Sequence, residues 1–409
     1  MKIFNSLSKQ KEDFIPIKHN EVKMYICGQT VYDYCHLGHA RKAVVFDMVR
    51  RWFIASGYKV VFVENITDID DKIIRRAEEN GETIYQLTER YIKYMHEDFA
   101  SLGVMRPDHE PKATEYVSQM VYLIQDLINK NYAYQAINGD VYYRVRKFVG
   151  YGKLSGKSLD DLRAGERVDV DLNKEDPLDF VLWKASKENE VYWDSPLGNG
   201  RPGWHIECSA MSEEILGKNF DIHGGGQDLQ FPHHENERAQ SNALINKEAV
   251  DLWVHGEHLL FEGKKMSKSS GNVVLLNDVI DRGIDPLAIR LCFLENKYRS
   301  QMDLTWNSIE AAHETLKRWR LKMSQWSNDS SVTADAEIEN AFNTDLDTSR
   351  AIMRLREIEK DGSENKAALF RYADQVLALD LERPIEVKTL TPQMEELLEQ
   401  RERARAEKR

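Results

Sequence analysis

The sequence predicts an α/β fold in which a doubly wound parallel sheet carries an inserted domain and is followed by a helical bundle. A strand, a loop, a helix and a second strand follow one another over residues 22–63, the pattern of a parallel βαβ unit. Sheet-like sequence returns near Phe220, after a stretch of different character. Beyond Asp285 the helical period dominates.

The opening unit predicts where a ligand binds. An apolar strand is expected over residues 22–27 and is broken by Gly28; a helix is expected over residues 42–55 and a second strand over residues 59–63. Ligands bind at the carboxyl ends of strands in such sheets. We therefore expect a nucleotide close to the segment that follows Cys27.

The rest of the chain divides into further segments. Helices are expected over residues 83–100 and 114–131, and a strand over residues 140–145 lies within a turn-rich stretch. Sheet resumes near Phe220 and over residues 250–255, before helices at 308–326 and 336–378 and a charged tail, 391–409, expected to be a solvated helix. The expected parts are a first half of a nucleotide-binding domain (1–131), an inserted domain (132–203), a second half (204–284) and a helical bundle (285–409).

Composition is that of a globular protein rather than a membrane or secreted protein. The 409 residues are 42% hydrophobic and 30% charged, and the longest apolar runs are too short to span a bilayer. No secretory leader precedes the first strand, so a cytoplasmic location is expected. Four cysteines are too few for a disulfide framework and favour metal or catalytic roles. The net charge of −12 argues against nonspecific coating of nucleic acid but leaves a local RNA surface open.

Two short motifs suggest nucleotide chemistry. The first runs from Thr30 to His39 and ends in His36-Leu37-Gly38-His39, where two imidazoles three residues apart at a helix start can face a phosphate. Alone, such a run is more often a loop accident. The second is Lys265-Met266-Ser267-Lys268-Ser269, whose lysines can neutralise a triphosphate; alone, it reads as a solvated basic loop. Their order, on either side of an insertion, favours the nucleotide interpretation.

These two motifs resemble the signatures of class I aminoacyl-tRNA synthetases, and the sequence between them resembles the cysteine-specific family. The similar stretches are 25–28, 65–72, 203–211, 223–226 and 231–237, and the resemblance extends to about residue 405. The family implies a Rossmann-type catalytic domain, with His36, His39, Lys265 and Lys268 as catalytic residues. It implies ATP contacts from a larger set: Thr30, His36, Gly38, His39, Gly224, Gly225, Lys265, Ser267 and Lys268.

A metal site is expected from four further residues. His233 and Glu237 are four apart and would share one face of a helix, while Cys27 and Cys208 each follow a strand or lie in a loop. From the residues alone, buried structural cysteines are the alternative. The resemblance implies that all four positions bind one Zn²⁺, which would bind the thiolate of a cysteine substrate and discriminate against serine. A closed structural zinc site is the competing interpretation.

The amino-acid pocket is expected beside this metal. Trp204, His205 and His234 are neighbours of the ligands in sequence and are expected to shape it, although packing is an equal alternative for Trp204. Asp33 and Asp228 are expected to hold the substrate ammonium, with turn formation as the alternative. The glycines at 224–226 permit close approach of adenine or ribose, or form a tight turn.

The implied activity is that of a cysteine–tRNA ligase. Cysteine would be activated with ATP and Mg²⁺ to cysteinyl-adenylate and transferred to the 3′ end of cysteine tRNA, by a monomer without membrane contact. One alternative is a cysteine ligase of the mycothiol type, with a small-molecule amine as acceptor; another is a noncatalytic synthetase paralogue.

Two departures from the family pattern stand out. Gln29 occupies a position where the family usually has proline, and we expect it to loosen the loop without touching a ligand. Relatives normally continue beyond a charged helix like residues 401–409 into a domain that recognises the anticodon, so that domain is expected to be largely absent.

Overall fold

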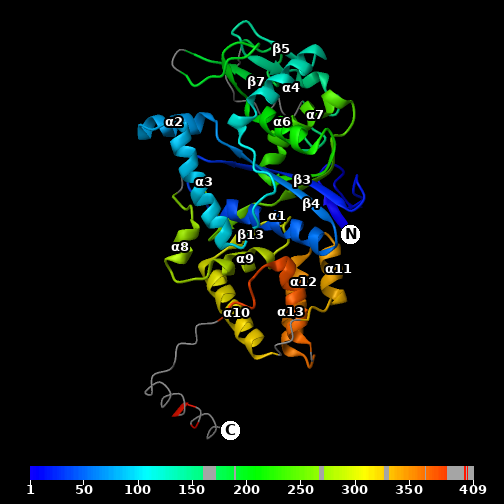
Figure 1. Ribbon diagram of the computed structural model, residues 1–409, viewed down its shortest axis with the longest axis vertical. Helices are drawn as coiled ribbons and strands as arrows, with labels where there is room; N and C mark the ends of the chain where they lie inside the picture. The colour runs from blue at the N-terminus through cyan, green and yellow to red at the C-terminus, as the bar shows by residue number, and fades with distance from the viewer. Residues whose placement is uncertain are drawn as a thin grey trace.

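The computed structural model describes residues 1–159, 172–187, 190–266, 271–326, 331–363 and 365–384, with Gln400, Arg401 and Arg403. A parallel sheet lies in the middle of the molecule, with an antiparallel sheet at one end and a group of helices at the other (Figure 1). No helix in these described ranges is long and apolar enough to cross a membrane.

The central sheet has four parallel strands in the order β10-β9-β3-β4. They are β3 (Glu21–Thr30), β4 (Lys59–Thr67), β9 (Phe220–Gly226) and β10 (Val250–Gly256). The α/β prediction is confirmed. Each predicted strand of this sheet is present. β3 and β4 run further at their carboxyl ends than the apolar pattern indicated, because the polar residues that end them remain paired.

Alternate residues of the strands pack on opposite faces of this sheet. Met24 and Ile26 of β3 belong to a core shared with α1 (Leu37–Ala55), whereas Tyr25 and Cys27 belong to a second core shared with α6 (Trp204–Leu216) and α7 (His233–Ile245). Apolar side chains on both faces account for the continuous apolar run that the sequence shows. The alternation also directs Cys27 toward α6 and α7.

An antiparallel sheet is interposed in sequence between β4 and β9. Its order is β5 (Ala133–Gln135), β6 (Val141–Tyr143), β7 (Phe180–Ala185) and β8 (Gly200–Pro202). It is preceded by α2 (Asp71–Asn80), α3 (Ile84–Ser101) and α4 (Val117–Asn129). The helix predicted over 83–100 is α3, which the side chain of Thr83 caps, and α2 was not predicted.

The carboxyl-terminal part is helical, as predicted, but more finely divided. It contains α8 (Leu276–Ile280), α9 (Pro286–Leu294), α10 (Trp306–Gln325), α11 (Ala336–Asn343), α12 (Thr348–Lys360) and α13 (Lys366–Leu377). The single stretch predicted over 336–378 is wrong: Asp345 and Leu346 adopt left-handed φ angles of 59° and 55° and end the first helix. Of the tail predicted over residues 391–409, the structure describes Gln400, Arg401 and Arg403, which are helical and exposed.

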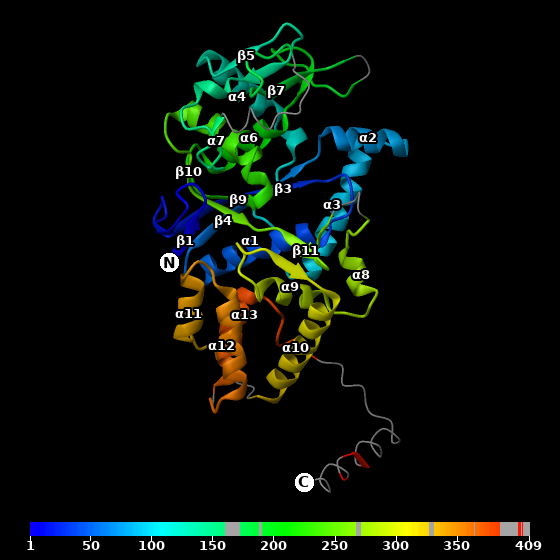
Figure 2. The same ribbon diagram turned by 180° about the vertical axis from the view of Figure 1, so that it is seen from behind.

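Short strands and one buried ion pair tie these parts together. The hairpin β1 (Lys2–Asn5) and β2 (Gln10–Asp13) lies beside β10, and β11 (Leu259–Phe261) pairs with β12 (Lys264–Lys265) and β13 (Met302–Leu304), as Figure 2 shows from behind. Arg290 of α9 is fully buried and donates to Asp47 of α1 at 2.6 Å. The helical group is thereby fixed against the central sheet.

Candidate functional site

Four side chains converge beneath the carboxyl end of β3. Cys27 comes from β3, Cys208 from α6, and His233 and Glu237 from successive turns of α7; all are buried. The two Sγ atoms are 3.6 Å apart, Cys208 Sγ is 3.5 Å from His233 Nε2, and Cys27 Sγ is 3.4 Å from Glu237 Oε1. The expectation that Cys208 follows a strand or lies in a loop is wrong, because it lies within a helix.

The position of Cys27 depends on an irregularity in β3. The pairing of β3 with β4 shifts register between Ile26 and Gln29, and the Gly28 N–H donates to Asn65 Oδ1 at 2.8 Å. A Cβ on Gly28 would lie 1.5 Å from the Asn65 carbonyl oxygen, so only glycine fits. The bulge sets the direction in which the neighbouring cysteine points.

Burial controls the protonation of the cluster. Desolvation raises the pKa of the Cys208 thiol to about 11 and raises the pKa values of Cys27 and Glu237 well above their usual ranges. It lowers the pKa of His233 well below its usual range, so this imidazole is neutral. A metal ion would displace the thiol protons.

The donor set fits a zinc ion. Two sulfurs, one imidazole nitrogen and one carboxylate oxygen are the ligands that zinc prefers. Zinc bond lengths place the ligand atoms of a tetrahedron roughly 3.3–3.8 Å apart, and the measured separations are 3.4 to 3.6 Å, with 3.0 Å between His233 Nε2 and Glu237 Oε1. Among the described residues, Glu237 Oε2 accepts no hydrogen bond, although the atom is buried.

A chain of imidazoles lies behind this cluster. His234 Nδ1 is 2.8 Å from His255 Nε2, and His255 Nδ1 is 2.8 Å from the Ser6 hydroxyl in the turn between β1 and β2. Burial lowers the pKa of His255 to about 3. His234 Nε2 is buried and has no hydrogen-bond partner in the described part of the chain. A second possible ligand set consists of His234, His223, Cys27 and Glu237. It shares Cys27 and Glu237 with the first set.

His233 is also held from its other side. Its Nδ1 is 2.9 Å from His205 Nδ1, which leaves Nε2 to face the cluster, and the Trp204 ring stacks on it at 4.1 Å. Trp204 is 38% exposed, too much for a side chain whose role is only to fill the core. Trp204 and His205, which were predicted to shape the pocket, therefore both contact the ligand candidate His233. The His234 ring also contacts the His233 ring.

The first signature forms the start of α1. His36 is the N-cap, its Nδ1 accepts from Gly38 N at 3.0 Å, and His39 Nδ1 accepts from His36 N at 3.2 Å. The two rings stack with centroids 3.8 Å apart. A Cβ on Gly38 would lie 2.8 Å from the His36 ring, so glycine permits this stacking. The paired imidazoles lie at the positive end of a long helix.

The described part of the second signature begins in β12, and its Met266 lies close to the first signature. The Met266 side chain is buried and approaches to 3.7 Å of the position that a Gly38 Cβ would take. Leu37 N donates to Val274 O at 3.1 Å, which joins the two segments on the far side of the signature. Lys265 is in β12 and exposed, whereas Ser267 and Lys268 lie outside the described residues. The fold thus brings together two motifs that are more than 200 residues apart in sequence.

The glycines of β9 serve packing as well as any ligand. Gly224 and Gly225 lie within the strand, so the tight-turn alternative is wrong for them. A Cβ on Gly224 would lie 2.3 Å from the Phe46 ring, and one on Gly225 would lie 2.9 Å from the His234 ring. Glycine is required there whether or not a nucleotide binds.

The remaining predicted residues are placed less decisively. Asp33 Oδ1 accepts from the Tyr34 N–H at 2.8 Å, the local contact that the turn alternative predicted, and Asp228 is exposed in the short helical turn after β9. Thr30 ends β3, opposite Thr67 of β4. Gln29 is buried and accepts from the Cys35 thiol at 2.9 Å. Its Nε2 is buried and has no hydrogen-bond partner among the described residues, so the expectation that Gln29 loosens the loop stays a prediction.

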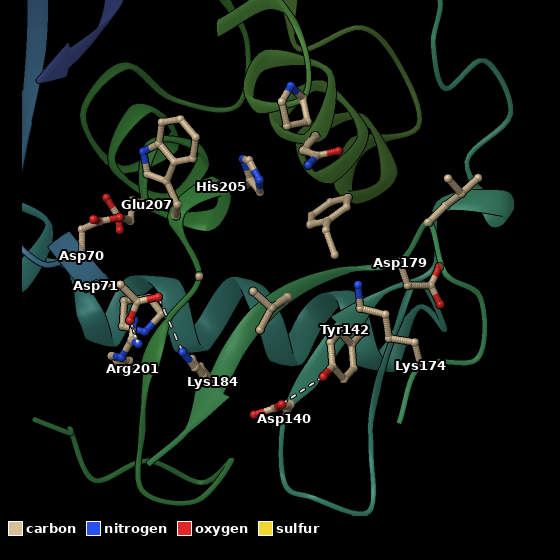
Figure 3. Close-up of a pocket in the computed structure, with 18 of the residues that line it drawn as sticks. Asp70, Asp71, Asp140, Tyr142, Lys174, Asp179, Lys184, Arg201, His205 and Glu207 are labelled. Atoms are coloured by element: carbon tan, nitrogen blue, oxygen red, sulfur yellow. Dashed lines mark hydrogen bonds and ion pairs between the residues drawn. The ribbon is translucent and has the colours of Figure 1, made fainter. Parts of the chain in front are cut away.

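A cavity of about 650 Å³ opens between this cluster and the antiparallel sheet. Trp204 is among the residues that line it, and Figure 3 shows His205 and Glu207 on one wall, with Tyr142, Lys184 and Arg201 opposite. Lys184 and Arg201 both pair with Asp71. Burial raises the pKa of Glu207 well above its usual range. The cavity combines aromatic faces with paired charges and adjoins the metal-ligand candidates.

Several residues of this site were missed from the sequence. His223, His255, Ser6 and Asn65 come from four separate segments, and each carries a side chain that is common in loops and strand ends. The His223-Gly224-Gly225-Gly226 run was noticed, but its histidine was not given a role. Only pairing of β9 with β10 and the position of the amino-terminal hairpin reveal that these side chains meet.

Comparison with protein families gives a match over most of the catalytic region. Residues 13–314 match the family model described as the tRNA synthetases class I (C) catalytic domain. The chain is 54% identical over 377 residues to a cysteine–tRNA ligase of Dechloromonas aromatica, covering 90% of this chain and 82% of that protein. It is 52% identical to the cysteine–tRNA ligase of Nitrosomonas europaea, and that alignment covers 93% of this chain and 85% of that protein.

Solved structures agree on the fold. The methionyl-tRNA synthetase of Mycobacterium tuberculosis, in complex with methionyl-adenylate, aligns with a TM-score of 0.61 at 14% identity. The alignment covers 88% of this chain and 90% of that one. At this identity the likeness concerns the arrangement of the chain and not its substrate.

Proposed function

Because the chain belongs to the class I tRNA synthetase family of the cysteine–tRNA ligases, we propose that it activates cysteine with ATP and transfers the cysteinyl group to cysteine tRNA. A carboxylate oxygen of cysteine attacks the α-phosphorus of ATP and pyrophosphate leaves. A terminal ribose hydroxyl of the RNA then attacks the acyl carbon and AMP leaves. The observation that carries the proposal is the buried set of Cys27, Cys208, His233 and Glu237, whose ligand atoms all lie within 4.8 Å of one another.

This set is suited to recognise a thiol. We assign it one Zn²⁺, which would bind the substrate thiolate as a soft Lewis acid and leave a serine hydroxyl poorly bound. An apolar pocket alone would separate the two amino acids by only about 1–3 kcal/mol. The protein contributes a dry, preformed ligand set: the bulge at Gly28 directs Cys27, and His205 keeps Nε2 of His233 toward the centre.

The signature loops are assigned to ATP. Stacked His36 and His39 at the start of α1, with Lys265 and Lys268, would bind the phosphates and stabilise charge as pyrophosphate leaves. Thr30, Gly38, Gly224, Gly225 and Ser267 are assigned to the same nucleotide. Mg²⁺ would accompany the triphosphate. Positioning and charge stabilisation carry the step, and we assign no general base.

The amino-acid pocket completes the catalytic site. Trp204, His205 and His234 would surround the cysteine side chain, and Asp33 with Asp228 would attract its ammonium group. The ring contacts of Trp204 and His205 with His233 support the first assignment. The second rests on charge alone.

We assign residues 132–203 to an inserted connective domain and residues 285–409 to a helical unit that contacts the RNA. The cavity between the inserted sheet and α6 would receive the 3′ end of the RNA, since aromatic rings and cations suit unstacked bases and phosphates. We also propose that the protein acts as a monomer in the cytoplasm.

The proposal is tested by amino-acid-dependent exchange of pyrophosphate into ATP. Cysteine should support exchange, and serine should be rejected by more than the roughly 10–200-fold that an apolar pocket can supply. Exchange that depends equally on serine, or that requires neither amino acid, would contradict the assignment of the metal-ligand set to substrate recognition.

Replacement of Ser6 by alanine is expected to raise KM for cysteine several-fold and to leave KM for ATP unchanged. The hydroxyl orients His255 and, through it, His234, whose free Nε2 faces the cluster. Losing one buried hydrogen bond costs about 1–3 kcal/mol. The measurement is steady-state exchange at varied cysteine and varied ATP. Ser8→Ala, in the same turn but exposed, should change neither constant.

A further inference from the structure

The helix that carries His233 and Glu237 does not cap its own start. α7 begins at His233 after Pro232, and no side chain caps its first turn. The next residues, Glu235, Asn236 and Arg238, are polar and buried. Buried polar side chains on a helix need hydrogen-bond partners from elsewhere in the fold. Those partners determine where the ligand atoms of the first two turns lie.

Each of the three has a partner in residues 150–155, which we call the 150–155 loop, and Arg238 also pairs with Glu248. The Tyr151 hydroxyl donates to Asn236 Oδ1, and the Ser155 N–H donates to Glu235 Oε2 at 2.8 Å. Arg238 Nη1 donates to the Gly150 carbonyl at 3.0 Å. The contacts lie on one side of α7, while His233 and Glu237 face the metal-ligand set.

The loop is itself held rigidly. Gly152 has a φ of 89°, and a Cβ there would lie 1.9 Å from the Lys157 carbonyl oxygen, so the turn requires glycine. The Leu154 carbonyl accepts from Lys9 Nζ at 2.7 Å and from Gln230 Nε2 at 2.9 Å. A loop held by a fixed turn and by these two hydrogen bonds can in turn hold the helix that it contacts.

We propose that the 150–155 loop is a clamp on α7, and that Tyr151 is a positioning residue for the metal ligands His233 and Glu237. The clamp belongs to the inserted segment, and Tyr151 and Asn236 both line the cavity beside the metal-ligand set. α7 therefore carries both Asn236, which lines the cavity, and the proposed metal ligands His233 and Glu237. The inference rests on the proposed zinc site and names a residue that sets its geometry without touching the metal.

Tyr151→Phe tests the clamp because it removes one hydroxyl and keeps the ring. We expect the visible spectrum of the cobalt(II)-substituted protein to change and transfer of zinc to a chelator to become faster. We expect KM for cysteine to rise about tenfold, as is usual when a residue supporting a metal ligand is lost. kcat should change less, and KM for ATP should stay the same.

Tyr134→Phe is the matched control. Its hydroxyl donates to Asp179 at 2.9 Å and accepts from the Glu175 N–H, within the inserted sheet. Both variants should lose thermal stability, but only Tyr151→Phe should alter the cobalt spectrum and the cysteine KM. Equal loss of stability with an unchanged spectrum and KM in Tyr151→Phe would overturn the proposal.

A second variant separates a clamp from a direct contact between Asn236 and substrate. If Asn236 acts through Tyr151, the variant carrying both Tyr151→Phe and Asn236→Ala should be no worse than the poorer single variant. Additive losses would contradict the clamp. Failure of the wild-type protein to activate cysteine would refute the proposed function instead, and the cobalt spectra of the variants would still test the clamp.

Discussion

Replacement of Cys208 by alanine is expected to remove the bound zinc and to lower cysteine-dependent pyrophosphate exchange by on the order of 10³-fold, since a metal contact to a reacting group is worth several kcal/mol. The thiol supplies one of four ligand atoms. The polar residues one turn away on the same face of α6 are engaged elsewhere: His205 Nδ1 contacts His233 Nδ1, and the Ser212 hydroxyl donates to the Ser209 carbonyl. Zinc content is measured on the purified protein, and exchange is measured at saturating ATP.

Cys292→Ala is the matched control for this experiment. Cys292 is also a buried thiol, but it lies in α9 and donates to the Ser308 carbonyl, away from the metal-ligand set. This variant should retain one zinc per chain and full exchange. A Cys208→Ala protein that keeps its zinc and its exchange activity would show that the cluster is not the substrate-binding metal site.

Replacement of Lys268 by alanine is expected to lower the rate of adenylate formation by on the order of 10²–10³-fold, the usual cost of losing one group that stabilises transition-state charge. The affinity for cysteine should stay nearly unchanged, because the metal-ligand set and not the signature loop would hold the thiol. Single-turnover formation of adenylate and equilibrium binding of cysteine separate the two effects.

Lys264→Ala serves as the control, since this lysine is exposed, lies in the same hairpin and precedes the signature. It should leave both quantities near the wild-type values. Loss of cysteine affinity with an intact rate in Lys268→Ala would contradict the assigned role.

Much of the fold could be predicted from local pattern. The strands before Gly28 and after Gly57 read as apolar runs because both faces of the central sheet are buried, and α1 and α3 follow from their helical period. The break between α12 and α13 has a local signal, because Asp361-Gly362-Ser363 is a turn-forming run. The break at Asp345 and Leu346 could not be predicted, because Leu346 carries no signal for a left-handed backbone. Their conformation is stabilised by contacts distant in sequence, such as those of Asp345 with Arg299 and Tyr298.

The site could be predicted only where the resemblance named it. From spacing alone, His233 and Glu237 suggest one helical face, but nothing local links them to Cys27 or Cys208, which are far apart in the chain. The imidazole chain from His234 to Ser6 depends on how the amino-terminal hairpin packs on β10. The contacts of the 150–155 loop depend on how the inserted segment returns to α7. These are products of tertiary packing, which sequence periodicity does not encode.

The most direct test of the central claim is transfer of radiolabelled cysteine from this protein, ATP and Mg²⁺ to purified cysteine tRNA. We predict charging that depends on ATP, yields an ester at the terminal ribose and is absent in Cys208→Ala. Exchange of pyrophosphate without charging would contradict tRNA as the acceptor and direct the search to a small-molecule amine. Absence of both reactions would contradict cysteine activation itself.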